Sequence, residues 1–136
     1  MGRPIAVDSV ILIYLFEKNL RYIEEVRGLF RFIADGTERA VFASIGLIEV
    51  LTGPKRIGDE KLAFIYKEMI AHFPNLAVIS LNDEIIELAS SLRAKYKLAT
   101  PDAIHLATAI NTGARVFVTN DKGLRKVKEI KVRTLA

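Results

Sequence analysis

The sequence contains no cysteine and only two histidines among its 136 residues. The absence of cysteine excludes disulfide bonds, thiolate catalysis and zinc sites built on cysteine. Long apolar runs are also missing, because the longest, Val10 to Phe16, is far short of the roughly 20 residues that a membrane-spanning helix needs. The opening residues, MGRPIAVDS, lack the apolar core and cleavage site of a signal peptide. We therefore expect a cytoplasmic protein that has no membrane partner.

Positive charge is concentrated in the stretch from Arg115 to Ala136, which holds seven basic and two acidic residues, a net charge of +5 within a chain of net charge +4. This stretch could contact a polyanion such as RNA. It could equally be a solvated edge strand that lysines protect against aggregation, and charge alone does not separate the two interpretations. Its basic residues are Arg115, Lys122, Arg125, Lys126, Lys128, Lys131 and Arg133.

Short apolar stretches alternate with longer amphipathic ones, which predicts β-strands separated by helices. The predicted strands are Ile5–Val7, Ala40–Ala43, Leu76–Leu81, Arg115–Thr119 and a possible fifth at Ile130–Leu135. Strands separated by helices require crossover connections, which favour a parallel sheet covered on its faces. The sequence thus predicts an α/β fold. We expect a three-layer α/β/α sandwich with a mainly parallel sheet of four or five strands, in one domain spanning residues 1–136.

Glycine, proline and threonine positions predict the ends of two helices, the one that carries Glu49 and the one that carries Asp102. A helix that starts at Ser44 should stop at Gly53-Pro54, since glycine and proline interrupt helices. Thr100 should cap the next helix of interest, with Pro101 in its first position and Gly113 just past its end.

Carboxylates stand at positions that a parallel sheet would bring together. Asp8 and Asp121 each follow a predicted strand, and Glu49 lies about one turn into the helix after the second strand. Ligands bind beyond the carboxyl ends of such strands, so these acids could form a site. Asp102 begins the helix that precedes the fourth strand, and the sequence does not decide whether it reaches the same end.

Oxygen ligands without cysteine favour a hard cation, Mg²⁺ or Mn²⁺, and such a site suits the hydrolysis of phosphodiester bonds. Each acid also has an ordinary structural alternative. Asp8 could be a solvated loop carboxylate, Asp102 a favourable charge in a first helical turn, and Asp121 part of an Asx-turn. Glu49 could be the one polar position of a mostly buried helix. For His105 we favour a core or hydrogen-bonded histidine over a metal ligand.

Four ordered motifs cover almost the whole chain. They are a strand that leads into Asp8-Ser9 and an apolar helix, SIGLIEVL around Glu49, PDAIHLATA around Asp102, and FVTND at Asp121. Each motif is weak alone, but as an ordered set they resemble the PIN domain. The resemblance is greatest to small ribonuclease toxins of the VapC type.

The resemblance implies a parallel-sheet α/β/α fold and a Mg²⁺- or Mn²⁺-dependent endoribonuclease site. The family's acidic quartet falls on Asp8, Glu49, Asp102 and Asp121. Supporting positions of the family's site fall on Ser9, Thr119 and Asn120. The family also implies a homodimer and a cognate antitoxin protein. One departure is Val10, which stands where many of these toxins have asparagine or another polar residue.

Three functional hypotheses follow from these observations. The first is a metal-dependent endoribonuclease, the toxin of a toxin–antitoxin pair, with RNA as substrate. The second is a non-catalytic module of the same fold that binds RNA or a protein. The third is a phosphatase or phospho-receiver, which is disfavoured because Val10 removes the Asp-x-Asp pattern of one such phosphatase class.

Overall fold

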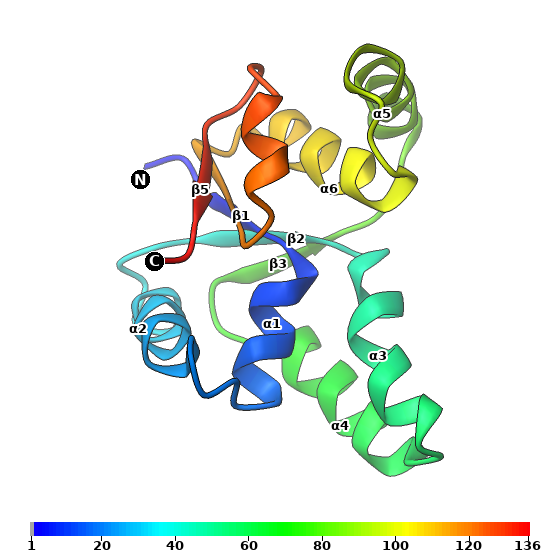
Figure 1. Cartoon of the computed structure of the whole chain (residues 1–136). Helices are drawn as coiled ribbons and strands as arrows, with labels where there is room; N and C mark the ends of the chain where they lie inside the picture. Colours follow the sequence, from blue (N-terminus) through cyan, green and yellow to red (C-terminus); the bar gives the residue numbers. More distant parts are fainter. Residues whose placement is uncertain (1) are drawn as a thin grey trace.

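The computed structural model describes residues 2–136, which form five strands, six α-helices and one 3-10 helix (Figure 1). In chain order the elements are β1 (Ile5–Val7), α1 (Ser9–Phe16), α2 (Ile23–Ala34), β2 (Ala40–Ala43), α3 (Gly46–Arg56), α4 (Glu60–Ala71), β3 (Leu76–Ile79), α5 (Asp83–Tyr96), α6 (Thr100–Asn111), β4 (Val116–Thr119), η1 (Lys122–Lys126) and β5 (Val132–Thr134).

The five strands form one sheet in the order β3-β2-β1-β4-β5, and every pair of neighbours is parallel. β1 is central, with Ala6 opposite Val41 of β2 on one side and Phe117 of β4 on the other. All strands therefore end at the same edge of the sheet, and the predicted fold class, including the fifth strand, is confirmed.

Helices cover both faces of the sheet, as Figure 1 shows, with α1 to α4 on one face and α5 and α6 on the other. Side chains alternate along β1 accordingly: Ile5 and Val7 join the core under α1 to α4, and Ala6 joins the core under α5 and α6. Complete burial of a Val, Ile or Phe side chain contributes roughly 1.5–3 kcal/mol. The two cores therefore hold the strand ends in fixed positions.

The prediction that the third helix stops at Gly53-Pro54 is wrong, because α3 continues to Arg56 with Pro54 inside it. Proline loses one backbone hydrogen bond, but Pro54 lies in the last turns of the helix and its ring is buried. The residue before it is glycine, which has no Cβ to clash with the proline ring. The cost of an internal proline is thereby reduced.

The cap predicted at Thr100 is also wrong by one residue. α6 begins at Thr100 itself, and Ala99 occupies the cap position without a side-chain hydrogen bond. Pro101 still lies in the first turn, where a missing backbone N–H leaves no helical bond unmade. Gly113 follows the helix with φ of +74°, a conformation that glycine adopts without strain.

Among residues 2–136, no helix combines the length and the apolar character needed to cross a membrane.

Candidate active site

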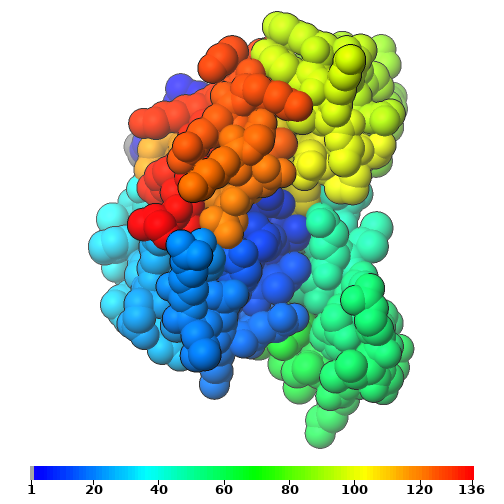
Figure 2. Space-filling model, viewed as in Figure 1, coloured from blue at the N-terminus to red at the C-terminus, as the bar shows by residue number. Residues whose placement is uncertain are grey.

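The four carboxylates predicted from the sequence line one open cavity of about 270 Å³ at the carboxyl end of the sheet. Asp8 follows β1 and Asp121 follows β4. Glu49 lies in the first turn of α3, and Asp102 lies in the first turn of α6. The blue, turquoise, yellow and orange segments that carry them meet near the middle of the face shown in Figure 2. The other lining residues are Ser9, Val10, Tyr14, Thr119 and Asn120.

The direction of α6 explains why Asp102 reaches this end of the sheet. The helix ends at Asn111, and the chain then enters β4 at Val116, at the start of the parallel strands. α6 therefore runs back along the sheet, so its first turn lies beside the strands' carboxyl ends. The structure thus decides what the sequence left open. Asp102 shares the cavity with Asp8, which comes from the opposite end of the chain.

Asp8 is buried, with 8% of its surface exposed, and neutral donors hold its carboxylate. Its Oδ1 accepts the backbone N–H of Ser9 at 2.8 Å, which caps α1. Its Oδ2 accepts the hydroxyl of Thr119 at 2.7 Å. The same hydroxyl oxygen accepts the backbone N–H of Asp121 at 3.1 Å. Thr119, which is fully buried, therefore joins the two acids that follow β1 and β4.

His105 lies behind Glu49, one turn after Asp102 on α6. Its Nε2 is 3.1 Å from Glu49 Oε1 and 3.7 Å from Asp8 Oδ1. The side chain is 2% exposed, and its Nδ1 has no hydrogen-bond partner within residues 2–136. A proton on Nδ1 would be a buried donor without an acceptor, whereas a proton on Nε2 can be donated to Glu49. We therefore assign Nε2–H as the donor to Glu49, which agrees with the expected hydrogen-bonded histidine.

Gly46, the first residue of α3, allows this close packing. A Cβ at this position would lie 2.4 Å from Phe42 Cζ and 2.8 Å from His105 Cε1, distances that real Cβ atoms do not adopt. Phe42 and His105 are themselves in contact, with ring centroids 6.0 Å apart. Only glycine therefore lets α3 approach closely enough for Glu49 to receive the hydrogen bond of His105.

The cavity shifts the pKa values of two acids in opposite directions. Burial raises the pKa of the Asp102 carboxyl, and the negative charges of Asp8 and Asp121 raise it further. The hydrogen bond from His105 lowers the pKa of the Glu49 carboxyl, against the opposing effect of burial. Such opposed shifts within one cavity are typical of functional sites. A cation between the acids would relieve the repulsion that Asp102 experiences.

The donor set of the cavity is suited to Mg²⁺ or Mn²⁺, because it consists of carboxylate and hydroxyl oxygens. Among the described residues 2–136, no three His, Asp or Glu side chains lie so that together they could hold a metal ion as they stand. Mg²⁺ usually binds through one or two carboxylates, with water and substrate phosphate completing its shell. The cavity therefore fits a sparsely ligated cation, and it does not resemble a closed cage of protein ligands.

The supporting residues predicted from the sequence all reach the cavity, although not in equal roles. Ser9 donates its backbone N–H to Asp8, and Thr119 donates its hydroxyl. Asn120 donates its amide to the Tyr14 hydroxyl at 2.9 Å and makes no such contact with an acid within residues 2–136. Sequence reasoning missed Tyr14 as a lining residue. Its spacing of four residues from Val10, which places them on one face of α1, was the available signal.

Comparison with known proteins bears on the family and the fold of the chain. The sequence model of the PIN domain matches residues 5–130. None of the curated proteins matches the chain. A toxin–antitoxin complex from Klebsiella pneumoniae is similar in structure, with 25% identity, a TM-score of 0.68 and 92% of this chain and 93% of that chain covered.

Two further structures are similar at lower identity. VapBC2 from Rickettsia felis, bound to a promoter DNA fragment, has 15% identity and a TM-score of 0.78, with 96% of this chain and 97% of that chain covered. The sarcin–ricin loop cleaving toxin VapC20 from Mycobacterium tuberculosis has 16% identity and a TM-score of 0.74, with coverages of 95% and 98%. At these identities the likeness concerns the fold, and the family follows from the sequence match over residues 5–130. The chain belongs to the PIN domain family.

Proposed function

We propose that this protein is a metal-dependent endoribonuclease and the toxin of a toxin–antitoxin pair. The observation that carries the proposal is the convergence of four carboxylates, from four separate elements, on one open cavity. A cavity of this kind concentrates negative charge where an RNA phosphate would have to bind, which is unfavourable unless a cation accompanies it. Membership of the PIN domain family and the similarity to VapC20, a toxin that cleaves the sarcin–ricin loop, support the same class of reaction.

In this proposal carboxylates from the set Asp8, Asp102 and Asp121 would hold Mg²⁺ or Mn²⁺, with water and substrate phosphate completing its shell. Glu49 would be a further ligand or would orient the attacking water. The bound ion would polarise a phosphoryl oxygen and acidify the attacking water. As the orienting group, Glu49 would accept a hydrogen bond from that water. In either role, His105 fixes the Glu49 carboxylate from behind through its Nε2–H. Asp8 cannot turn away from the cavity without losing its bonds to Ser9 and Thr119. It therefore acts as the fixed member of the group.

The partners are part of the proposal. The similar structures from Klebsiella pneumoniae and Rickettsia felis are toxin–antitoxin assemblies, which supports a cognate antitoxin protein for this chain. We also propose a homodimer, as the family resemblance implies, and action on RNA in the cytoplasm.

Cleavage of RNA by the purified protein in Mg²⁺ or Mn²⁺ tests the activity. The Asp102→Asn variant is the matched control, since it removes one charge and keeps the size of the side chain. We expect metal-dependent cleavage by the wild type and a loss of at least about 100-fold in the variant, comparable to the removal of one electrostatic catalytic group. Equal cleavage by the two proteins, or none by the wild type on any RNA, would refute the mechanism.

A non-catalytic RNA- or protein-binding module of the same fold is the second candidate. One observation favours it, namely that no ready group of three metal-binding side chains exists within residues 2–136. Thermal unfolding with increasing Mn²⁺ separates the two candidates. If the folded site binds the ion, stability rises by about 2.7 kcal/mol at a concentration of 100 Kd, and the rise disappears in Asp102→Asn. A binding module shows no carboxylate-dependent shift.

A further inference from the structure

The amino ends of the strands, opposite the acidic cavity, carry arginines. Arg3 precedes β1, Arg39 precedes β2 and Arg115 precedes β4. Lys131 precedes β5 in the same way. Because all strands are parallel, these cations share one end of the sheet and the carboxylates share the other. From Arg115, just before β4, to Thr119 at its end, the chain spans about 13 Å at a rise of roughly 3.3 Å per residue.

Backbone carbonyls hold these guanidinium groups in place. Arg3 donates from Nε to the carbonyl oxygen of Gly113 at 2.8 Å and from a terminal nitrogen to that of Ala114 at 2.9 Å. Arg115 donates to the carbonyl oxygen of Arg3 at 3.0 Å and also pairs with Glu38. A guanidinium has five N–H donors, so these contacts orient Arg3 without using all of them. Its side-chain entropy is therefore already reduced before any ligand arrives.

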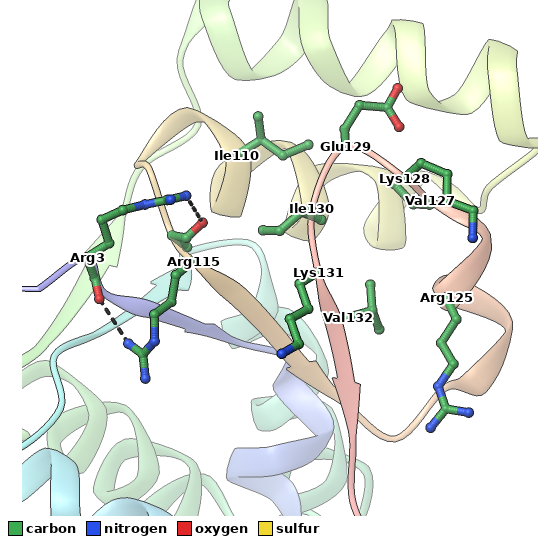
Figure 3. Close-up of a pocket in the computed structure, with 11 residues that line it drawn as sticks. Arg3, Ile110, Arg115, Arg125, Val127, Lys128, Glu129, Ile130, Lys131 and Val132 are labelled. Atoms are coloured by element: carbon green, nitrogen blue, oxygen red, sulfur yellow. Dashed lines mark hydrogen bonds between the residues drawn. The ribbon is translucent and has the colours of Figure 1, made fainter.

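Arg3 and Arg115 open into a groove of about 520 Å³ beside the edge strand β5. We call it the edge groove, and Figure 3 shows its lining residues. Arg3 and Arg115 stand at one end, Arg125 stands at the other, and Lys131 lies between them (Figure 3). Lys128 is a fifth basic lining residue, and all five are exposed.

Few negative charges oppose these cations. Glu129 is the one acidic residue among those that line the groove. Its carboxylate is already engaged, at 3.1 Å from Lys95 Nζ and at 2.6 Å from the Tyr96 hydroxyl, and it points away from Lys131 in Figure 3. The lining of the groove is therefore strongly positive, as a binding site for a chain of phosphates requires.

The edge groove and the acidic cavity share no lining residue, but hydrogen-bonded side chains link their walls across β5. Arg125 donates a hydrogen bond to Thr134, which lies opposite Thr119 in the register of β4 and β5. Thr119 in turn donates to Asp8 in the cavity. One end of the groove thus reaches the carboxyl end of the sheet, and the other reaches the arginines at the amino end.

We propose that the edge groove binds the sugar–phosphate backbone of the RNA strand on one side of the scissile bond. The inference rests on the proposed ribonuclease function, and it adds a second contact region outside the acidic cavity. Arginine and lysine contacts to phosphates position a nucleic acid without reading its bases. The groove therefore increases the affinity for longer RNA and leaves the choice of sequence to the cavity.

Two double variants test the groove. Each removes two positive charges, one pair from the groove and the other, as a control, from α4. Lys128→Gln with Lys131→Gln removes two groove cations and leaves the carbonyl contacts of Arg3 and Arg115 intact. Lys61→Gln with Lys67→Gln removes two exposed cations from α4, on the opposite face of the sheet. Each pair is made in the Asp102→Asn background without divalent metal. The Kd for a labelled unstructured RNA of about 20 nucleotides is then measured over a series of salt concentrations.

Each phosphate contact to a single strand contributes about −0.7 to the slope of log K against log salt, so we expect the groove pair to make the slope shallower by about 1.4. The α4 pair should leave the slope unchanged. With a four-nucleotide RNA, the slopes of the groove pair and the α4 pair should differ less, because this RNA is too short to occupy the cavity and the groove together. Equal effects of the two pairs, or an unchanged slope in the groove pair, would overturn the proposal.

The outcome is separable from that of the proposed activity, because binding is measured without metal and without cleavage. An altered slope in a protein that never cleaves RNA would support the groove and refute the nuclease. Normal cleavage with an unaltered slope would support the nuclease and refute the groove. Competition with polyglutamate provides a further control. If the groove pair weakens binding of polyglutamate but not of RNA, the groove serves an acidic protein and the RNA proposal fails.

Discussion

The two ends of the parallel sheet differ in charge and in how their charges are held. At the carboxyl end, the acids crowd into one cavity, where Asp8 is buried and the pKa of Asp102 is raised by burial and by its acidic neighbours. At the amino end, cations such as Arg3 lie exposed and are fastened to carbonyl oxygens. Crowding of like charges is unfavourable, which supports the proposal that the acidic end carries the chemistry. The basic end has the rigidity and exposure of a binding surface.

The largest expected effect concerns the chemistry of the acidic end alone. Asp102→Asn should reduce metal-dependent cleavage at least about 100-fold. In the absence of metal it should not weaken RNA binding, because it removes a negative charge that repels phosphate. Parallel measurement of the cleavage rate and the metal-free Kd checks this. A variant that lost affinity and activity together would show that the two ends do not divide the tasks.

His105 is expected to position Glu49, so its removal should damage the acidic end without changing the basic one. Loss of a residue that orients a metal or water ligand typically costs 10–100-fold. We expect this loss in Mn²⁺ affinity and cleavage for His105→Leu, and partial recovery for His105→Gln, whose amide can supply an N–H. Mn²⁺ affinity measured by thermal shift gives a readout independent of turnover. Equal behaviour of the two variants would contradict a positioning role.

Packing behind the acidic cavity should tolerate no additional methyl group. Gly46→Ala would place a Cβ 2.4 Å from Phe42, so we expect a loss of about 1–3 kcal/mol in unfolding free energy. Gly28→Ala on α2 is the matched control, because its Cβ would have no atom within 4 Å. That change should stabilise the protein by roughly 0.5–1 kcal/mol, as alanine replaces glycine within a helix. Urea unfolding of both variants measures the contrast.

The raised pKa of Asp102 predicts a smaller effect on stability. A carboxyl whose folded-state pKa is raised destabilises the fold when it is ionised, and this cost disappears as the pH falls through that raised pKa towards the unfolded value. Metal-free Asp102→Asn should therefore unfold a few degrees above the wild type at pH 7, with a difference on the order of 1 kcal/mol or less. The difference should shrink as the pH is lowered towards 4. Calorimetry at several pH values would reveal a constant difference if the cause lay elsewhere.

Arg3 offers an expected effect of similar size and the most direct check on the basic end. Arg3→Lys keeps the charge but cannot reproduce the two carbonyl contacts at Gly113 and Ala114. These bonds are exposed or half-buried, so we expect a stability loss of about 0.5–1.5 kcal/mol. RNA affinity should fall less than in the double lysine variant. A larger fall would mean that the orientation of the guanidinium, beyond its charge, determines binding.

Periodicity and the positions of the acids were sufficient to predict the fold and to bring Asp8, Glu49 and Asp121 to one edge of the sheet. The alternation of short and amphipathic stretches predicts the parallel sheet, and Asp8 and Asp121 mark where its strands end. Asp102 could not be placed from the sequence, because its position depends on the direction in which α6 crosses the sheet. The roles of these acids in catalysis and metal binding remain predictions.

Contacts between elements that are distant in the chain could not be predicted from the sequence. The bond from His105 to Glu49 joins residues 56 positions apart, and the space that permits it exists because Gly46 has no side chain. The end of α3 was predicted too early for a related reason, since burial of Pro54 depends on tertiary packing. The sequence also did not predict that the arginines at the strand starts lie close together. No short-range pattern relates Arg3 to Arg115 until the parallel register places β1 beside β4.

The strand order also has a consequence for synthesis of the chain on the ribosome. β1 emerges first, yet it is central and needs β4 as a neighbour, and the hydroxyl that holds Asp8 belongs to Thr119. Until residue 121 has been translated, the nascent chain lacks one of the four acids and the support of another. The acidic cavity therefore cannot assemble before β4 and Asp121 have left the ribosome. A protein proposed to cleave RNA would therefore complete its candidate site only after that point of its own synthesis.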